Sequence, residues 1–334
     1  MGLNPTTKNI LSFISRMGLS AVLLGYLFAK IDVQKTFEVL RSAYMGFMTY
    51  AAIVFFAINI LLLWRWVIFI KAMSLSASLR DIVRYYLIGL FGNLFLPTAI
   101  GGDFIKIYGL CKNSTQKTRV VASVLLDRLS GFAAIILVAL GAFFWGYRLL
   151  GDNAILLLIP MAGIAAVSVG FVSVLFNERL YSFCCRIFNA FPKIKEGLMG
   201  LHYDVVLMKD KRLEGVKAVA VSCAAQIIYA VAWYWIARAL HQNVGIVYFF
   251  IFVPLTCIAA SFPSIGGLGV REMGTVYLFG KVGMDAGIAA SLSLINFLFM
   301  VVFGLVGGIV YVSTLSSGRL QYYSQDAPVR PGEA

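Results

Sequence analysis

Hydrophobic residues form long runs along this chain, and short polar segments separate them. A helix rises about 1.5 Å per residue, so about 20 apolar residues cross the roughly 30 Å of hydrocarbon in a bilayer. Six runs reach that length: residues 11–29, 45–66, 120–145, 154–176, 216–239 and 287–312. The pattern therefore predicts an all-α polytopic membrane protein with six transmembrane helices, the first of them retained rather than removed as a signal peptide.

Two further apolar runs, residues 82–95 and 247–262, are shorter, and each leads into proline followed by paired glycines. These residues are Pro97, Gly101 and Gly102 after the first run, and Pro263, Gly266 and Gly267 after the second. Proline and glycine break helices and free backbone polar groups, which are tolerated at membrane depth only where protein or a wet cavity satisfies them. We therefore expect two re-entrant hairpins, at about residues 81–112 and 247–281, in place of two further spans.

The basic residues favour the same arrangement. If the run at 82–95 crossed the membrane, the lysine- and arginine-rich segment at 178–217 would lie outside, which the positive-inside rule disfavours. With re-entrant hairpins, the basic segments and both termini face the cytoplasm, as in a multi-pass protein of the inner or plasma membrane. The net charge of +13 is then explained by lipid phosphates and this bias, and nucleic acid is not an expected partner.

The order of elements suggests an internal duplication. Two spans, a hairpin and a span occur in residues 1–150 and again in 151–316, and three crossings per half would invert the second copy. Inverted repeats with broken helices are typical of secondary transporters, although chance similarity between apolar segments is the alternative. Between the halves, an amphipathic segment at about 178–213 is expected on the cytoplasmic surface, as a connector or as a partner surface. Residues 317–334 are expected to be a disordered cytoplasmic tail.

Composition limits the kinds of chemistry that this chain can support. Apolar residues make up 60% of it and charged residues 13%, so no separate soluble catalytic domain is expected. The five cysteines include no C-x-x-C pair, and His202 and His241 are isolated. We expect no metal site, no cofactor and no nucleophile–histidine–acid arrangement.

Charged residues close to apolar runs are the candidates for function, because such residues are costly in a membrane. Asp103 and Lys106 follow the first glycine pair, and their spacing of three on a helix allows them to pair with each other. Asp127 and Arg128 lie inside the span that begins near residue 120. There Arg128 could bind a ligand, or it could reach toward the surface with Asp127 as its neutralising partner.

Arg271 and Glu272 follow the second glycine pair. Adjacent helical residues point in different directions, so separate partners are expected for them. A glycine break before a helix offers free N–H groups and a positive dipole end, which suit a phosphate. Arginine adds a permanent charge and a planar fork of donors, so Arg271 is expected to be the main contact for a lipid phosphate.

Three segments, N-L-F-L-P-T-A-I-G-G-D, L-L-D-R-L-S-G and S-F-P-S-I-G-G-L-G-V-R-E, together resemble the lysylphosphatidylglycerol synthase transmembrane region, also described as the flippase-like or UPF0104 family. The resemblance covers nearly the whole chain. It implies lipid movement between leaflets without the soluble synthase domain of larger members. The motif positions that it matches are Asp103, Asp127, Arg128, Arg271 and Glu272, and Lys106 fits a basic position.

Three functions are thus open. The leading one is a flippase or transporter for a phosphate-bearing lipid, either a phospholipid, amino-modified or not, or an isoprenoid-linked lipid. The second is an intramembrane lipid transferase or phosphatase. The third is an accessory subunit of a lipid or glycan synthesis enzyme. Apart from its function, the chain could also pair with a second copy of itself as a homodimer.

Overall fold

The computed structural model describes residues 33–95, 101–112, 114–150, 211–260 and 268–325, and also residues 162, 163 and 166. Within these ranges the regular structure is helical and no strand is found. The helices are α2 (Val33–Arg41), α3 (Met45–Ala72), α4 (Leu79–Phe95), α5 (Gly101–Lys112), α6 (Lys117–Leu150), α10 (Arg212–Ala239), α11 (Ile246–Ala259), α12 (Val270–Gly280) and α13 (Ala286–Gln325). The predicted all-α class is confirmed for this part of the chain.

Four of these helices are long and apolar enough to cross a bilayer. They are α3, residues Lys117–Gly146 of α6, α10, and residues Ala286–Thr314 of α13. Each matches one of the six predicted spans, and the chain is an integral multi-pass membrane protein. The other two predicted spans, at 11–29 and 154–176, lie outside the described residues apart from isolated positions of the second.

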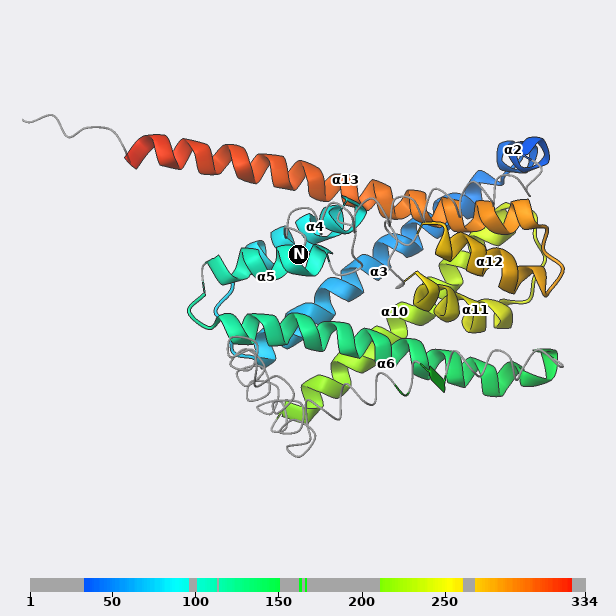
Figure 1. Cartoon of the computed structure of the whole chain (residues 1–334), viewed down its shortest axis with the longest axis horizontal. Helices are drawn as coiled ribbons and strands as arrows, with labels where there is room; N and C mark the ends of the chain where they lie inside the picture. The colour runs from blue at the N-terminus through cyan, green and yellow to red at the C-terminus, as the bar shows by residue number, and fades with distance from the viewer. Residues whose placement is uncertain are drawn as a thin grey trace, which may run out of the picture.

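Helices α3 and α10 form the centre of the molecule, where they lie side by side and antiparallel. At one end, the Tyr44 amide donates to the Ala239 carbonyl over 2.9 Å. Near the other end, the Arg65 guanidinium donates to the Ser222 hydroxyl over 3.3 Å. Helices α13 and α6 run along opposite sides, with α3 and α10 crossing obliquely between them (Figure 1).

The four remaining helices of the core form two packed pairs, α4 with α5 and α11 with α12. At 1.5 Å per residue, α4 is about 26 Å long and the other three are about 17–21 Å, so each is shorter than the roughly 30 Å hydrocarbon layer. In the first pair, contacts between Tyr85 and Gly109 and between Gly89 and Gly102 show that the two helices run antiparallel. These pairs occupy the regions where the sequence predicts hairpins.

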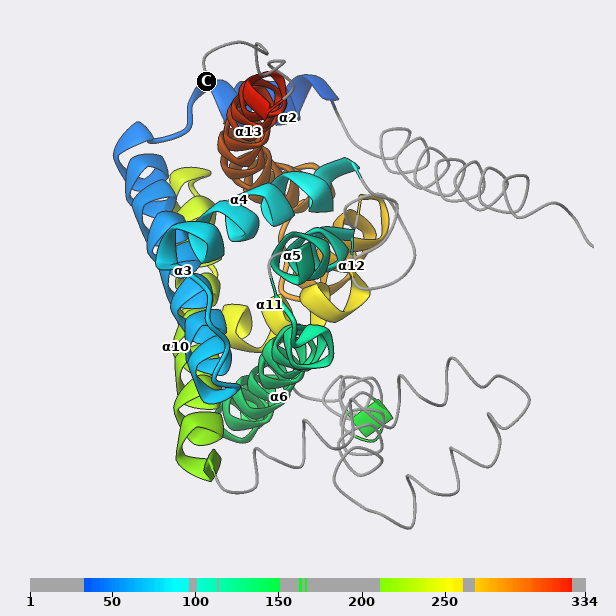
Figure 2. The same cartoon turned by 90° about the vertical axis from the view of Figure 1, so that its left-hand side faces the viewer.

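Each short pair packs on the last long helix of the other half. Helix α4 packs against α13, and α11 packs against α6. The α4–α13 contact is close because α13 carries glycines there: a Cβ on Gly307 would lie 1.9 Å from the Leu87 carbonyl oxygen, and one on Gly304 would lie 2.2 Å from a methyl group of Leu94. The end-on view in Figure 2 shows α4 passing beneath α13. The two halves are therefore interleaved.

One helix extends past a boundary predicted from the sequence, and several predicted features lie outside the described residues. Helix α13 continues to Gln325, past residue 316, where the sequence pattern places the end of the second repeat. The amphipathic segment at about 178–213 lies almost entirely outside the described residues, as do Pro97, Pro263, Gly266 and Gly267.

Candidate functional site

The start of α5 is held tightly against α4. The Gly102 amide donates to the Asn93 side-chain oxygen over 2.8 Å, and a Cβ on Gly102 would lie only 2.1 Å from the Gly89 carbonyl oxygen. Only glycine permits this approach of the two backbones. Because α5 begins here, the first two charged residues of its sequence, Asp103 and Lys106, point inward and are buried.

Helix α6 presents Asp127 and Arg128 to the same region. The Asp127 side chain is buried and accepts a hydrogen bond from Arg65 of α3, with 2.6 Å between Nε and Oδ1. The Arg128 side chain is 37% exposed and pairs through Nε with Asp103 Oδ2. Three helices, α3, α5 and α6, thus bring their charges together.

Lys106 completes this arrangement, which we call the charged cluster: Arg65, Asp103, Lys106, Asp127 and Arg128. The Lys106 ammonium lies 3.4 Å from Asp103 Oδ1 and 3.9 Å from Asp127 Oδ2. It also lies 5.1 Å from the centre of the Trp66 ring and 5.2 Å from that of Tyr86, which is cation–π geometry. Three cations and two carboxylates leave one net positive charge in the charged cluster.

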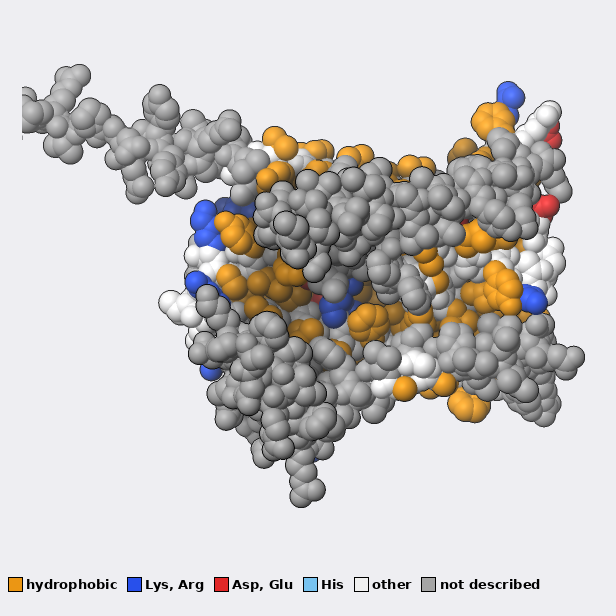
Figure 3. Space-filling model, in the orientation of Figure 1, with side chains coloured by type: hydrophobic (Ala, Val, Ile, Leu, Met, Phe, Trp, Pro, Cys, Tyr) orange, Lys and Arg blue, Asp and Glu red, His pale blue; other side chains and the backbone are white. Residues whose placement is uncertain are grey.

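The charged cluster lies inside the length of the long helices. Asp127 is ten residues after the start of α6 at Lys117, and Arg65 is seven residues before the end of α3 at Ala72, which corresponds to about 15 Å and 10 Å along the helices. On one face of the molecule, basic side chains lie in the middle among hydrophobic ones (Figure 3). Ionisable groups at such depth are costly and mark functional sites in membrane proteins.

Arg271 and Glu272 lie at the start of α12 and form a second, separate arrangement. Arg271 donates to Glu272 Oε1 from Nη2 over 2.6 Å and from Nε over 3.1 Å, and it also donates to the Ser293 hydroxyl of α13. The expectation of separate partners was therefore wrong. The reason is that Glu272 reaches back to accept the Gly269 amide, with 2.6 Å between the atoms, and this places its carboxylate beside the guanidinium.

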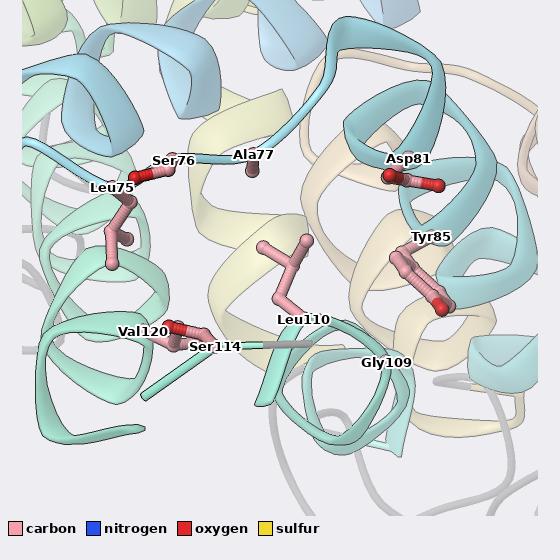
Figure 4. A pocket seen from close by; sticks show the side chains of 9 residues that line it. All are labelled: Leu75, Ser76, Ala77, Asp81, Tyr85, Gly109, Leu110, Ser114 and Val120. Carbon is pink, nitrogen blue, oxygen red and sulfur yellow. The ribbon is translucent and has the colours of Figure 1, made fainter. Parts of the chain in front are cut away.

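A small cavity lies near the charged cluster, between the end of α5 and the start of α6. Its lining includes Leu110, which is one turn after Lys106, and Val120, two turns before Asp127, together with Asp81 and Tyr85 of α4 (Figure 4). Its volume of about 40 Å³ is large enough for water and too small for a lipid headgroup. The cavity is therefore not the binding site for a lipid.

Comparison with known proteins adds the family. The family model for the lysylphosphatidylglycerol synthase TM region matches residues 13–308. The chain belongs to this family. It is also 24% identical to the UPF0104 membrane protein PH1989 of Pyrococcus horikoshii over 308 residues, which cover 84% of this chain and 90% of that protein. No solved structure matches the chain.

For this member of the lysylphosphatidylglycerol synthase TM-region family, the motifs located four of the five residues of the charged cluster. The predicted contact between Asp103 and Lys106 is present. Asp127 does not neutralise Arg128, however, because its main partner is Arg65 and Arg128 turns to Asp103. Adjacent residues on α6 point about 100° apart, so each reaches a different neighbouring helix.

Sequence reasoning missed Arg65 and its contacts. The sequence pattern places the end of the second apolar run at residue 66, and this puts Arg65 at the cytoplasmic end of a span. In the structure α3 continues for six more residues to Ala72, and Arg65 is buried. The available signal was the apolar stretch V-I-F-I directly after Trp66, which extends the hydrophobic run beyond the arginine.

Proposed function

We propose that this protein is a flippase-type transporter that moves a phosphate-bearing lipid between the two leaflets of the inner or plasma membrane. The observation that carries this proposal is the charged cluster, which holds three cations and two carboxylates at membrane depth. Its excess positive charge suits a phosphate, and guanidinium groups bind phosphate oxygens through paired N–H donors. Membership of a family named for a lipid synthase membrane region supports a lipid as the cargo.

The proposed architecture is an inverted repeat with two re-entrant helix pairs. Two observations support it: the short helices fall below the length of a span, and the packing of α4 on α13 is matched by that of α11 on α6. Such reciprocal packing is what a pseudo-two-fold axis between the halves requires. In transporters of this type, the two halves rock against each other and open a central site to one side at a time.

We assign the headgroup contacts to the charged cluster rather than to both clusters. Arg271 is already paired with a buried carboxylate and a hydroxyl group, and Glu272 also caps α12. This supports a structural role for that pair, which fixes the start of α12. Arg128 is the member of the charged cluster with an exposed side chain, and we take it as the first contact for the lipid phosphate.

The proposed orientation places both termini in the cytoplasm. Basic residues gather where α3 and α5 end and where α6 and α10 begin, and Lys211 donates to the Ala72 carbonyl at the end of α3 over 2.6 Å. The opposite end carries Glu38 and Asp285 beside its basic residues. In a background without the native cysteines, a cysteine introduced at Asp285 should be labelled by an impermeant reagent outside the cell, and one introduced at Lys112 should not. Labelling at position 112 from outside the cell would reject the orientation.

A leaflet-resolved assay tests the function. The purified protein is placed in vesicles with a tail-labelled phospholipid, and the label in the outer leaflet is bleached by an impermeant reductant. Wild-type protein should move the lipid without changing it chemically, and Arg128→Gln should slow the movement at least about tenfold, because it removes a charge-assisted contact. Arg84→Gln is the matched control, since Arg84 is 35% exposed and also pairs with an aspartate. No movement of either a phosphodiester or a phosphomonoester lipid by wild-type protein, or equal rates in the two variants, would reject the proposal.

A further inference from the structure

The charged cluster and the Trp66 ring beside it contain polar atoms that the protein itself does not satisfy. Among the described residues, the buried atoms without a hydrogen-bond partner include Asp103 Oδ1 and Trp66 Nε1. Lys106 is in ion-pair contact with Asp103 at 3.4 Å, but no hydrogen bond from its ammonium is present in the described part of the chain. As whole residues, Asp103 and Trp66 are 1% and 0% exposed, and Lys106 is 6% exposed. Unsatisfied buried groups of this kind are rare and call for a ligand or another explanation.

The unsatisfied atoms define the hydrogen-bonding pattern of a ligand. Lys106 and Trp66 offer N–H donors, which require acceptor oxygens on the ligand. Asp103 Oδ1 is an acceptor, which requires one donor on the ligand. The single excess positive charge of the charged cluster requires one negative charge. A ligand that fits therefore combines several acceptor oxygens, one O–H group and a charge of minus one.

We propose that the charged cluster binds a phosphate monoester in its singly protonated form, with its P–O–H group donating to Asp103. This inference rests on the proposed function and narrows its cargo to lipid phosphomonoesters. A simple phosphodiester carries the charge but lacks the O–H group, and a doubly ionised monoester lacks it too. A headgroup with an added amine brings a second cation to a region that is already positive.

The position of α5 fits a lipid as the source of the phosphate. The N-terminal end of this helix, at Gly101, adds a positive dipole beside Asp103. On the outer side of the same helix, Phe104 is 63% exposed and Tyr108 is 78% exposed. These side chains offer hydrophobic surface to a lipid chain whose phosphate enters past Arg128. Free phosphate has the same headgroup chemistry, and the experiment separates the two.

The test compares two soluble esters with the purified full chain in detergent. At about pH 5, methyl phosphate and dimethyl phosphate both carry one negative charge, but only methyl phosphate has an O–H group, because its second pKa is about 6. Binding is followed by tryptophan fluorescence and by the shift in unfolding temperature. Methyl phosphate should bind at least about tenfold more tightly, since dimethyl phosphate leaves a buried carboxylate oxygen unsatisfied. Equal binding of the two esters would overturn the inference.

Two variants examine the role of individual atoms. Asp103→Asn should remove the preference for methyl phosphate, whereas Asp81→Asn, a carboxylate of α4 outside the charged cluster, should keep it. Trp66→Phe keeps an aromatic ring but removes the indole N–H, and it should weaken the binding of both esters. This second variant tests the site even if Asp103→Asn fails to fold. An unchanged preference in folded Asp103→Asn, or unchanged affinities in folded Trp66→Phe, would contradict the assignment.

Vesicle assays separate this inference from the proposed function. With identical labelled tails, a phosphomonoester lipid should move faster than its methyl diester, and its rate should fall from about pH 6 to pH 8 as the O–H group is lost. Equal movement of both lipids would overturn the inference and leave the proposed transport intact. If methyl phosphate is preferred but no lipid moves, the transport proposal fails and the headgroup specificity holds. A monoester lipid that binds no more tightly than methyl phosphate would identify free phosphate as the ligand and refute the lipid source.

Discussion

Arg65 offers the sharpest test of how the charged cluster is held together. Its Nε lies 2.6 Å from Asp127 Oδ1, and the two side chains are 10% and 4% exposed. Arg65→Gln leaves the Asp127 carboxylate buried without its closest cation. Removing one partner of a buried ion pair costs about 3–5 kcal/mol, or about a 100- to 4,000-fold change in the folding equilibrium. We expect a large loss of folded protein.

The second substitution in this experiment is Asp127→Asn. Combined with Arg65→Gln, it removes the uncompensated charge, so most of the lost stability should return. The double variant still contains Lys106, Arg128 and Asp103, which keep one net positive charge. Lipid movement should therefore persist in the double variant if Arg65 only positions Asp127, and it should be lost if Arg65 contacts the lipid.

Stability is measured as the temperature at which half of the purified protein is lost from the monodisperse peak after heating, with the membrane level measured in parallel. Arg84→Gln is the control: Arg84 and Asp81 are 35% and 32% exposed and lie 3.4 Å apart, so their pair contributes about 0–1 kcal/mol. If Arg65→Gln is as stable as Arg84→Gln, or if the double variant is no more stable than the single one, the reasoning about this pair is refuted.

Three further substitutions test two glycine contacts by the same heating assay and the Arg271–Glu272 pair by the membrane level. Gly102→Ala should destabilise the protein by about 1–3 kcal/mol or more, because its Cβ would lie 2.1 Å from a carbonyl oxygen. The control, Gly141→Ala, should be neutral or stabilising, because nothing lies within 4 Å of its Cβ. Equal heating midpoints for the two variants would argue against close packing of α4 and α5. Arg271→Gln should lower the membrane level, and adding Glu272→Gln should restore it if the pair is structural. Failure of this rescue would point to a direct contact between Arg271 and a ligand. Gly307→Ala should destabilise as much as Gly102→Ala, since its Cβ would lie 1.9 Å from another carbonyl oxygen, and full tolerance would contradict the α4–α13 contact.

The sequence predicted the long helices well because their signal is local. An apolar run of sufficient length forms a helix in a membrane regardless of its neighbours, and four runs correspond to long helices of the structure. The glycine pair also marked the start of α5, which begins at Gly101. At Gly102, close contact between two backbones needs a residue without a side chain.

The pairing of charges could not be read from the sequence in the same way. Asp127 and Arg128 are neighbours in the chain, yet they bind partners 62 and 25 positions away on two other helices. Which helices meet is decided by tertiary packing, and spacing along one helix contains no information about it. The prediction of separate partners for Arg271 and Glu272 failed for the opposite reason. Helix geometry alone would point the Glu272 side chain away from Arg271, but a local capping contact with the Gly269 amide redirects it.

The packing of α4 on α13 also has a consequence for biosynthesis. Helix α4 ends at Phe95 and α13 begins at Ala286, roughly 190 residues later, so a ribosome that adds about 5–20 residues per second makes the partner about 10–40 s after α4. During this interval the surface of α4 around Leu87 and Leu94 has no glycine face to pack against. The first half of the protein therefore cannot complete its folding when it leaves the ribosome, and a chain that stops before α13 would leave α4 permanently without its partner.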